Sequence, residues 1–153
     1  MYIATQFSVF LINKPGVLAQ TLNAVADAKI NIIAMTMVDS VEHGVLRLVT
    51  ARTEEARAVL GKLNASVNET EVLCVNLPNH TGALADIATR LAQAHININY
   101  AYCTAGARGG RTTGVLKVAD LKKATRILEK VDPPKGKSDT RLQKMRPGLD
   151  QGR

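Results

Sequence analysis

Aromatic residues are scarce in this chain of 153 residues, which has no Trp, two Phe and three Tyr. The core must therefore be aliphatic, and a surface that stacks nucleobases on aromatic side chains is not expected. Two cysteines are too few for a disulfide scaffold and suit a reducing compartment, so we expect a cytoplasmic protein. No apolar run reaches the roughly 20 residues that a membrane helix needs. The first residues also lack the basic region and the cleavage site of a secretion signal.

Acidic residues are outnumbered, because 20 Lys and Arg stand against 13 Asp and Glu, for a net charge of +7. The excess is concentrated only in residues 132–153, whose adjacent prolines Pro133 and Pro134 predict disorder or a short edge strand. A dedicated nucleic-acid binder places its basic residues along one structured element. Nucleic acid is therefore not the expected partner, although a transcriptional regulator that uses this basic tail stays open as an alternative.

Groups for catalysis are missing as well. The histidines lack the spacing of metal ligands, and no nucleophile–base pair or pair of carboxylates is evident. Residues 106–111 lack the lysine and the following helix of a phosphate-binding loop. We interpret them as the tip of a hairpin, and the less favoured alternative is an arm that contacts an anion. Cys74 and Cys103 fall on predicted strands and are expected to be small core residues. We expect no enzyme activity, no metal and no cofactor.

The chain does contain an internal repeat. Residues 7–38 match residues 73–104 at an offset of 66, with 11 identical positions out of 32, where average composition gives about two by chance. Residues 44–47 and 114–117 extend the match at an offset of 70. The sequence therefore predicts two copies of one unit of about 65 residues.

Each copy predicts elements in the order β-α-β-β-α-β, the split βαβ arrangement of ferredoxin-like folds. In copy one, apolar and β-branched segments predict strands at residues 7–12, 30–38, 45–51 and 66–71. The first of these is apolar on both faces, so it should be central in its sheet. A helical period begins at Val17, and Thr53 is the predicted N-cap of a second helix.

Copy two predicts strands at residues 72–77, 96–104 and 113–118 and helices at 83–94 and 121–130, the latter capped by Asp120. No linker separates the copies, so the last strand of copy one should run directly into the first strand of copy two. Copy two has no evident fourth strand. The predicted fold class is α+β, with two ferredoxin-like units in antiparallel sheets that carry helices on one face. The units occupy residues 1–70 and 71–131, and the tail occupies residues 132–153.

The loop between the first strand and the first helix is the predicted binding site of each copy. Gly16 and Gly82 open a helix directly after a strand, where glycine allows an unusual φ. The N–H groups of Val17 and Leu18, and those of Ala83 and Leu84, can hold a carboxylate with the help of the helix dipole. Asn13 and Asn79 precede the glycines by three residues and offer both donors and acceptors. On one copy alone, a structural turn is the favoured interpretation of these residues. Recurrence at matched positions narrows its advantage over a binding site, although shared ancestry preserves a structural turn equally well.

These residues resemble a known family. The segment Asn13-Lys14-Pro15-Gly16-Val17-Leu18, followed by Ile30-Asn31-Ile32, is similar to the signature of the ACT domain, and residues 79–84 with 96–98 repeat it. The resemblance covers residues 5–131 and implies small regulatory domains that bind amino acids between paired domains. It implies that the residues facing ligand are Asn13, Gly16, Val17, Leu18 and Asn31 in copy one and Asn79, Gly82, Ala83, Leu84 and Asn97 in copy two.

One departure bears on the ligand, because Leu11 and Leu77 stand where some amino-acid-binding members have a polar residue. The resulting interpretation is a non-catalytic regulatory protein that binds a small amino acid and transmits binding to a partner or to its own assembly. The alternative within regulation is the small regulatory subunit of acetolactate synthase. The expected partners are an amino acid, a metabolic enzyme and a second copy of the chain. The second copy is expected because the strand at residues 30–38 is an edge strand that is apolar on both faces.

Overall fold

The computed structural model describes residues 1–38, 43–78, 80–104 and 112–129. Within them the elements are β1 (Tyr2–Ile12), α1 (Val17–Asp27), β2 (Ile32–Val38), β3 (His43–Thr50), α2 (Thr53–Leu60), β4 (Ser66–Leu77), α3 (Ala83–Gln93), β5 (Ile98–Thr104), β6 (Thr112–Val118) and α4 (Leu121–Glu129). The predicted tail at 132–153 and the predicted hairpin tip at 106–111 lie outside the described residues. None of the four described helices is long and apolar enough to cross a membrane.

The predicted α+β class is confirmed, with the two units joined in one antiparallel sheet of six strands in the order β2-β3-β1-β4-β6-β5. We call β1 to α2 together with the first half of β4 unit one. The second half of β4 together with α3 to α4 is unit two. Unit one shows the ferredoxin-like order β4-β1-β3-β2, and β2 and β5 form the two edges of the sheet.

The strands β1 and β4 belong to both units. The prediction that two strands run together is confirmed, because β4 continues without interruption from Ser66 to Leu77. The strand β1 begins at Tyr2, five residues earlier than predicted, and its first residues pair with the second half of β4, Tyr2 with Cys74 and Ala4 with Val72. The start of β1 thus takes the place of the fourth strand that unit two lacks.

Two helix caps were predicted, and the structure supports one of them. The backbone N–H of Lys123 donates a hydrogen bond to Asp120 Oδ1 at 2.8 Å, so the cap of α4 is confirmed. The prediction for α2 is wrong, because Thr53 is already its first helical residue and Arg52 holds the cap position. The Arg52 guanidinium instead donates to the carbonyl oxygens of Ala28 and Lys29 at 2.9 and 2.7 Å, which ties the start of α2 to the end of α1.

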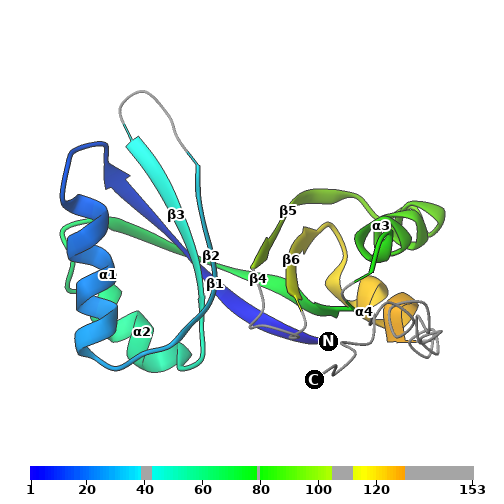
Figure 1. The fold of residues 1–153 in the computed structure, drawn as a ribbon, viewed down its shortest axis with the longest axis horizontal. Helices are drawn as coiled ribbons and strands as arrows, with labels where there is room; N and C mark the ends of the chain where they lie inside the picture. The colour runs from blue at the N-terminus through cyan, green and yellow to red at the C-terminus, as the bar shows by residue number, and fades with distance from the viewer. Residues whose placement is uncertain (39–42, 79, 105–111, 130–153) are drawn as a thin grey trace, which may run out of the picture.

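The helices of each unit cover the same face of the sheet, α1 and α2 at one end of the molecule and α3 and α4 at the other (Figure 1). Two separate aliphatic cores lie beneath them. The core of unit one is built around Phe7, Val9, Leu11, Val25, Leu46, Leu48 and Leu60. The core of unit two is built around Leu73, Val75, Leu77, Leu91, Leu116, Val118 and Leu128.

The helix-free faces of the two units contact each other, because the sheet bends between them. A third small core of Ala34, Val49, Val72, Cys74 and Val115 lies there, with Tyr102 packed against it. The sequence predicts helices on one face of each sheet, and part of the apolar surface on the other face is buried between the two units within the chain.

A buried glutamine fixes the contact between the two faces. Gln6 is fully buried, and its Nε2 donates to Tyr100 Oη at 2.8 Å. Its Oε1 accepts a hydrogen bond from Tyr102 Oη at 3.0 Å. Burial raises the pKa of the Tyr102 hydroxyl, which therefore stays a hydrogen-bond donor.

The two cysteines differ in burial. Cys74 is buried as predicted, whereas the prediction for Cys103 is wrong because its side chain is exposed. Cys103 lies on β5, an edge strand of the sheet. An edge strand has a neighbour on one side only, so its side chains are less completely covered.

Candidate functional site

The loop before α1 has the backbone conformation that the sequence predicts. Gly16 stands at the helix N-cap with φ of +90°, a left-handed value that favours glycine. A Cβ atom added there would meet no atom within 4 Å. The glycine is therefore required by its backbone angle, and the space beside it is open.

The loop before α3 repeats this geometry bond for bond. Gly82 has φ of +94° and also faces open space. In unit one, the N–H of Lys14 donates to Ile12 O at 2.8 Å and that of Gln20 to Gly16 O at 2.9 Å. The bonds at the matched positions of unit two are His80 N–H to Pro78 O at 2.9 Å and Asp86 N–H to Gly82 O at 2.9 Å.

The N–H groups that remain available differ by one position from those predicted. Val17 donates to Lys14 O and Ala83 to His80 O, each with a long 3.4 Å bond. Neither helix start has a side-chain cap. At the two helix starts, the backbone N–H groups without an acceptor among the described residues are those of Gly16, Leu18 and Ala19 in unit one and of Gly82, Leu84 and Ala85 in unit two. Sequence reasoning missed the two alanines, although the rule that a helix leaves its first N–H groups unpaired would have found them.

The side chains around the two helix starts are not alike. Asn13 is exposed, and its amide makes no hydrogen bond with any described residue, whereas Asn79 lies outside the described residues. Leu84 is 41% exposed, while its counterpart Leu18 is partly buried against the core of unit one. The two loops therefore offer the same backbone donors in different apolar surroundings.

The structure does not bring Asn31 and Asn97 to these loops. Each asparagine follows the C-terminal end of the helix that its glycine begins, so the full length of α1 or α3 separates the two. Eleven helical residues span about 16 Å. The backbone oxygens of Asn31 and Asn97 instead accept hydrogen bonds from Ala51 and Ala119, both at 3.0 Å.

The two loops also lie far from each other within the chain. The strands β1 and β4, which lead into them, are antiparallel, with Phe10 opposite Ser66 and Tyr2 opposite Cys74. Their C-terminal ends, Ile12 and Leu77, therefore point to opposite ends of the sheet, as the positions of α1 and α3 in Figure 1 make visible.

The protein-family model described as an ACT domain pair matches residues 1–132 of the sequence. The chain belongs to this family. Solved structures agree with the assignment. Protein BT0572 from Bacteroides thetaiotaomicron is 28% identical over 83% of this chain and 87% of its own, with a TM-score of 0.76. The regulatory subunit of aspartate kinase from Thermus thermophilus has the same fold at 14% identity, covering 84% of this chain and 96% of its own, with a TM-score of 0.60. No curated protein sequence shows significant similarity to the chain.

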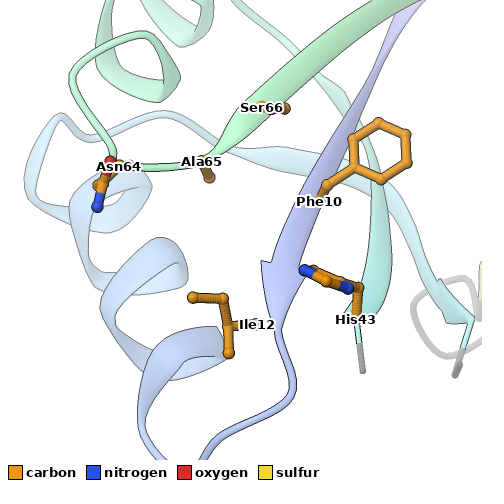
Figure 2. A pocket seen from close by; sticks show the side chains of 6 residues that line it. All are labelled: Phe10, Ile12, His43, Asn64, Ala65 and Ser66. Carbon is orange, nitrogen blue, oxygen red and sulfur yellow. The ribbon is translucent and has the colours of Figure 1, made fainter. Parts of the chain in front are cut away.

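A depression of about 540 Å³ lies at the end of the first ACT domain (Figure 2). It is lined by Phe10, Ile12, His43, Asn64, Ala65 and Ser66. Phe10 and Ile12 are 37% and 51% exposed, although the strand was expected to be central with both faces covered. The strand is central, but this face is open near its C-terminal end, where Ile12 leads into the glycine loop. The depression was not predicted, because alternation along a strand does not tell how far the facing unit extends over it.

Among the described residues, no three side chains of His, Cys, Asp or Glu are grouped as a metal ion requires. His80 lies in the loop of the second ACT domain, and its Nδ1 is 3.0 Å from Thr81 O. The described residues of the first loop offer backbone donors, the Asn13 amide, the Lys14 ammonium group and aliphatic side chains, and those of the second offer backbone donors, the His80 imidazole and aliphatic side chains.

Proposed function

We propose that this ACT pair is a non-catalytic regulatory protein that binds a small amino acid at its glycine loops. The observation that carries the proposal is the same set of unpaired N–H groups at the starts of α1 and α3, each beside a glycine with positive φ and open space. Convergent backbone donors at a helix N-terminus favour an anionic group by about 0.3–1 kcal/mol through the helix dipole alone.

The α-carboxylate of the ligand is assigned to the N–H groups of Leu18 and Ala19. The Asn13 amide oxygen can accept from the ligand ammonium group, because that side chain is exposed and makes no hydrogen bond with a described residue. The nearby side chains, including the half-buried Val17 and Leu18, are aliphatic. The proposed ligand therefore has a small or apolar side chain.

A complete site is proposed to need a second chain. The resemblance assigns Asn31 and Asn97 to the ligand, yet a helix of about 16 Å separates each from the loop of its own unit. Loop and asparagine can therefore face one ligand only across an interface between chains. The edge strand β2, which exposes Met35, Met37 and Val38 by 39–45%, is the proposed place of that contact.

The output of the site is proposed to be a change in this assembly or in a bound metabolic enzyme, in the cytoplasm. Coupling between ligand binding and such a contact is typically 1–3 kcal/mol. The regulatory subunit of aspartate kinase from Thermus thermophilus, which shares the fold, is one example of a chain of this design.

The first test is thermal unfolding in the presence of each of the twenty amino acids. A ligand at 100 times its Kd stabilises the folded state by about 2.7 kcal/mol. We expect Asn13→Ala to abolish the part of this shift that the first loop contributes and the control Asn23→Ala, an exposed asparagine on α1, to keep the whole shift. The Asn13→Ala variant is preferred to Gly16→Val, because a valine at positive φ would also strain the loop. A full shift in the Asn13→Ala protein would remove the site from this loop.

The second test asks whether the site lies between chains. We expect light scattering to give a dimer, and Asn31→Ala or Asn97→Ala to lose binding although the substitution is remote from the loop of its own unit. Mixing Asn31→Ala chains with Asn13→Ala chains should restore part of the binding, since one of the two sites that the first-domain loops form in a mixed dimer is then intact. A 16.4 kDa monomer with and without ligand, or no recovery on mixing, would contradict the shared site.

A further inference from the structure

A row of polar side chains crosses the helix-free face of unit one. Arg47 on β3 lies opposite Ser8 on β1 and Thr36 on β2. All three are partly buried. Alternation along the strands places them on the face that turns toward unit two, because Leu46 and Leu48 on either side of Arg47 belong to the core under the helices.

The Arg47 guanidinium is held by a ring from the other unit. Its Cζ lies 4.0 Å from the ring centroid of Tyr100, and Tyr100 is itself fixed by the hydrogen bond from buried Gln6. A guanidinium stacked on an aromatic face keeps its N–H groups free, because they point outward in its own plane. The stacking therefore orients a planar set of donors without satisfying them.

Arg47 differs in this respect from the other described arginines, each of which donates to a carbonyl or carboxylate oxygen. The acceptors belong to Ala28, Lys29 and Glu55 for Arg52, to Glu54 and Glu69 for Arg57, to Ile127 for Arg90 and to Lys122 for Arg126. Arg47 has no acceptor among the described residues. A half-buried guanidinium without an acceptor is an unsatisfied donor group, and such groups are uncommon in folded proteins.

A second cation approaches the same tyrosine from unit two. Lys117 lies opposite Tyr100 in the pairing of β5 with β6, and its Nζ has a carbonyl partner, Glu71 O, at 3.3 Å. The strands hold two acidic residues, Glu69 and Glu71, both at positions of β4 that alternate onto the helix face. Arg47 of unit one and Lys117 of unit two therefore both lie beside Tyr100, and no carboxylate of the strands lies on this face to neutralise them.

We propose that this junction is a binding site for a small oxyanion, a carboxylate or a phosphate, distinct from the glycine loops. Two oxygens of the anion pair with the N–H edge of Arg47, the geometry that makes arginine favourable for such groups. Ser8 can donate its own proton, since its Oγ accepts from Gln6 Nε2 at 3.2 Å, and Thr36 supplies a second hydroxyl. Lys117 adds charge from the facing unit, so the anion bridges the two ACT domains.

The experiment follows the ring signals of Tyr100 by NMR during separate titrations with sodium acetate and sodium phosphate at constant ionic strength. We expect a saturable shift for at least one of the two anions, and the comparison tells which oxyanion the junction prefers. Arg47→Gln should weaken binding at least about tenfold, because it removes charge-assisted hydrogen bonds. Lys117→Gln should weaken it less, and Arg47→Lys should retain part of it because the charge remains.

The matched control is Arg126→Gln, which removes an exposed arginine on α4 and should leave the affinity unchanged. Asn13→Ala should also leave it unchanged, so failure here and failure of the proposed amino-acid site can be told apart. The proposal would be overturned if the shift never saturated. It would also be overturned if Arg47→Gln and Lys117→Gln both bound the anion with the affinity of wild type. Loss of the shift in Asn13→Ala would do so as well, because the shift would then depend on the loop before α1 and not on the junction.

Discussion

The two ACT domains come from one repeated sequence, yet they complete their sheets differently. The first uses its own fourth strand, the residues from Ser66 that pair with Phe10 and its neighbours. The second uses Tyr2 to Ala4, residues that precede the region of the repeat. The repeat therefore determines loops and cores locally, whereas the strand that closes the second sheet is supplied by the first half of the chain.

The ends of the two domains also differ in surface chemistry. Phe10 and Ile12 are exposed beside the depression in the first domain. The residues at the matched positions of the second are Asn76 and Pro78. The two exposed apolar side chains beside the first loop therefore have no apolar pair at the matched positions of the second domain, and the two loops adjoin different surfaces.

The largest expected effect tests whether the halves are one folding unit. Leu46 and Leu116 occupy matched positions and are 0% and 1% exposed. Leu46→Ala and Leu116→Ala should each lower the free energy of unfolding by about 2–5 kcal/mol. Because β1 and β4 run through both halves, each variant should still unfold in one transition. Urea unfolding followed by circular dichroism and by tyrosine fluorescence checks this, with Met37→Ala as a control that loses little. Two separated transitions would show that the halves unfold independently.

A smaller effect is expected at the contact between the halves. Gln6→Ala leaves the hydroxyls of Tyr100 and Tyr102 without their partner, and an unsatisfied buried polar group costs about 1–3 kcal/mol. Ser8→Ala, which removes only the more distant 3.2 Å acceptor, should cost less. Chemical denaturation of both variants gives the two values. If Ser8→Ala proved the more destabilising, Gln6 would not be the residue that fixes the contact.

The smallest expected effect is a loss of stability at acidic pH that arises from an ion pair in the first domain. Arg57 holds both oxygens of Glu69, at 2.5 and 2.8 Å, and lowers the pKa of that carboxyl below its ordinary value of 4.5. A carboxyl whose pKa is lowered in the folded state stabilises the protein at pH values above its ordinary pKa. This stabilisation is lost as the pH falls through the pKa of the folded state. The matched position in the second domain is Ile3.

Melting temperatures between pH 7 and pH 3 measure this contribution. Wild type should lose stability on acidification more steeply than Glu69→Gln, while Glu71→Gln, at a neighbouring position without the arginine, should follow wild type. Parallel curves for wild type and Glu69→Gln would remove the ion pair as a source of acid sensitivity.

Most of the fold could be predicted from the sequence, because its determinants are local. The 66-residue offset brings Gly16 onto Gly82, and both adopt the same left-handed φ. The apolar period from Val17 predicted α1, and the missing linker predicted a continuous β4. These features depend on backbone preferences and on side chains close together in the sequence.

The features that could not be predicted depend on pairs distant in the chain. Gln6 and Tyr102 are 96 positions apart, and nothing near either residue indicates the other. The pairing of Tyr2 with Cys74 has the same character. By contrast, the separation of Asn31 from Gly16 could have been found by counting helical residues, since each adds about 1.5 Å along the axis.

The shared strands have a consequence for how such a protein can change over evolutionary time. The pairing register of β1 with β4 sets Thr5 against Glu71, two positions related by the 66-residue offset, so a pseudo-twofold axis passes through this pair. Two separate chains that exchange a strand about a twofold axis have the same symmetry. Residues near the axis are constrained by both halves at once. The loops at Gly16 and Gly82 lie at opposite ends, where one copy can acquire a new specificity while the other keeps the old one.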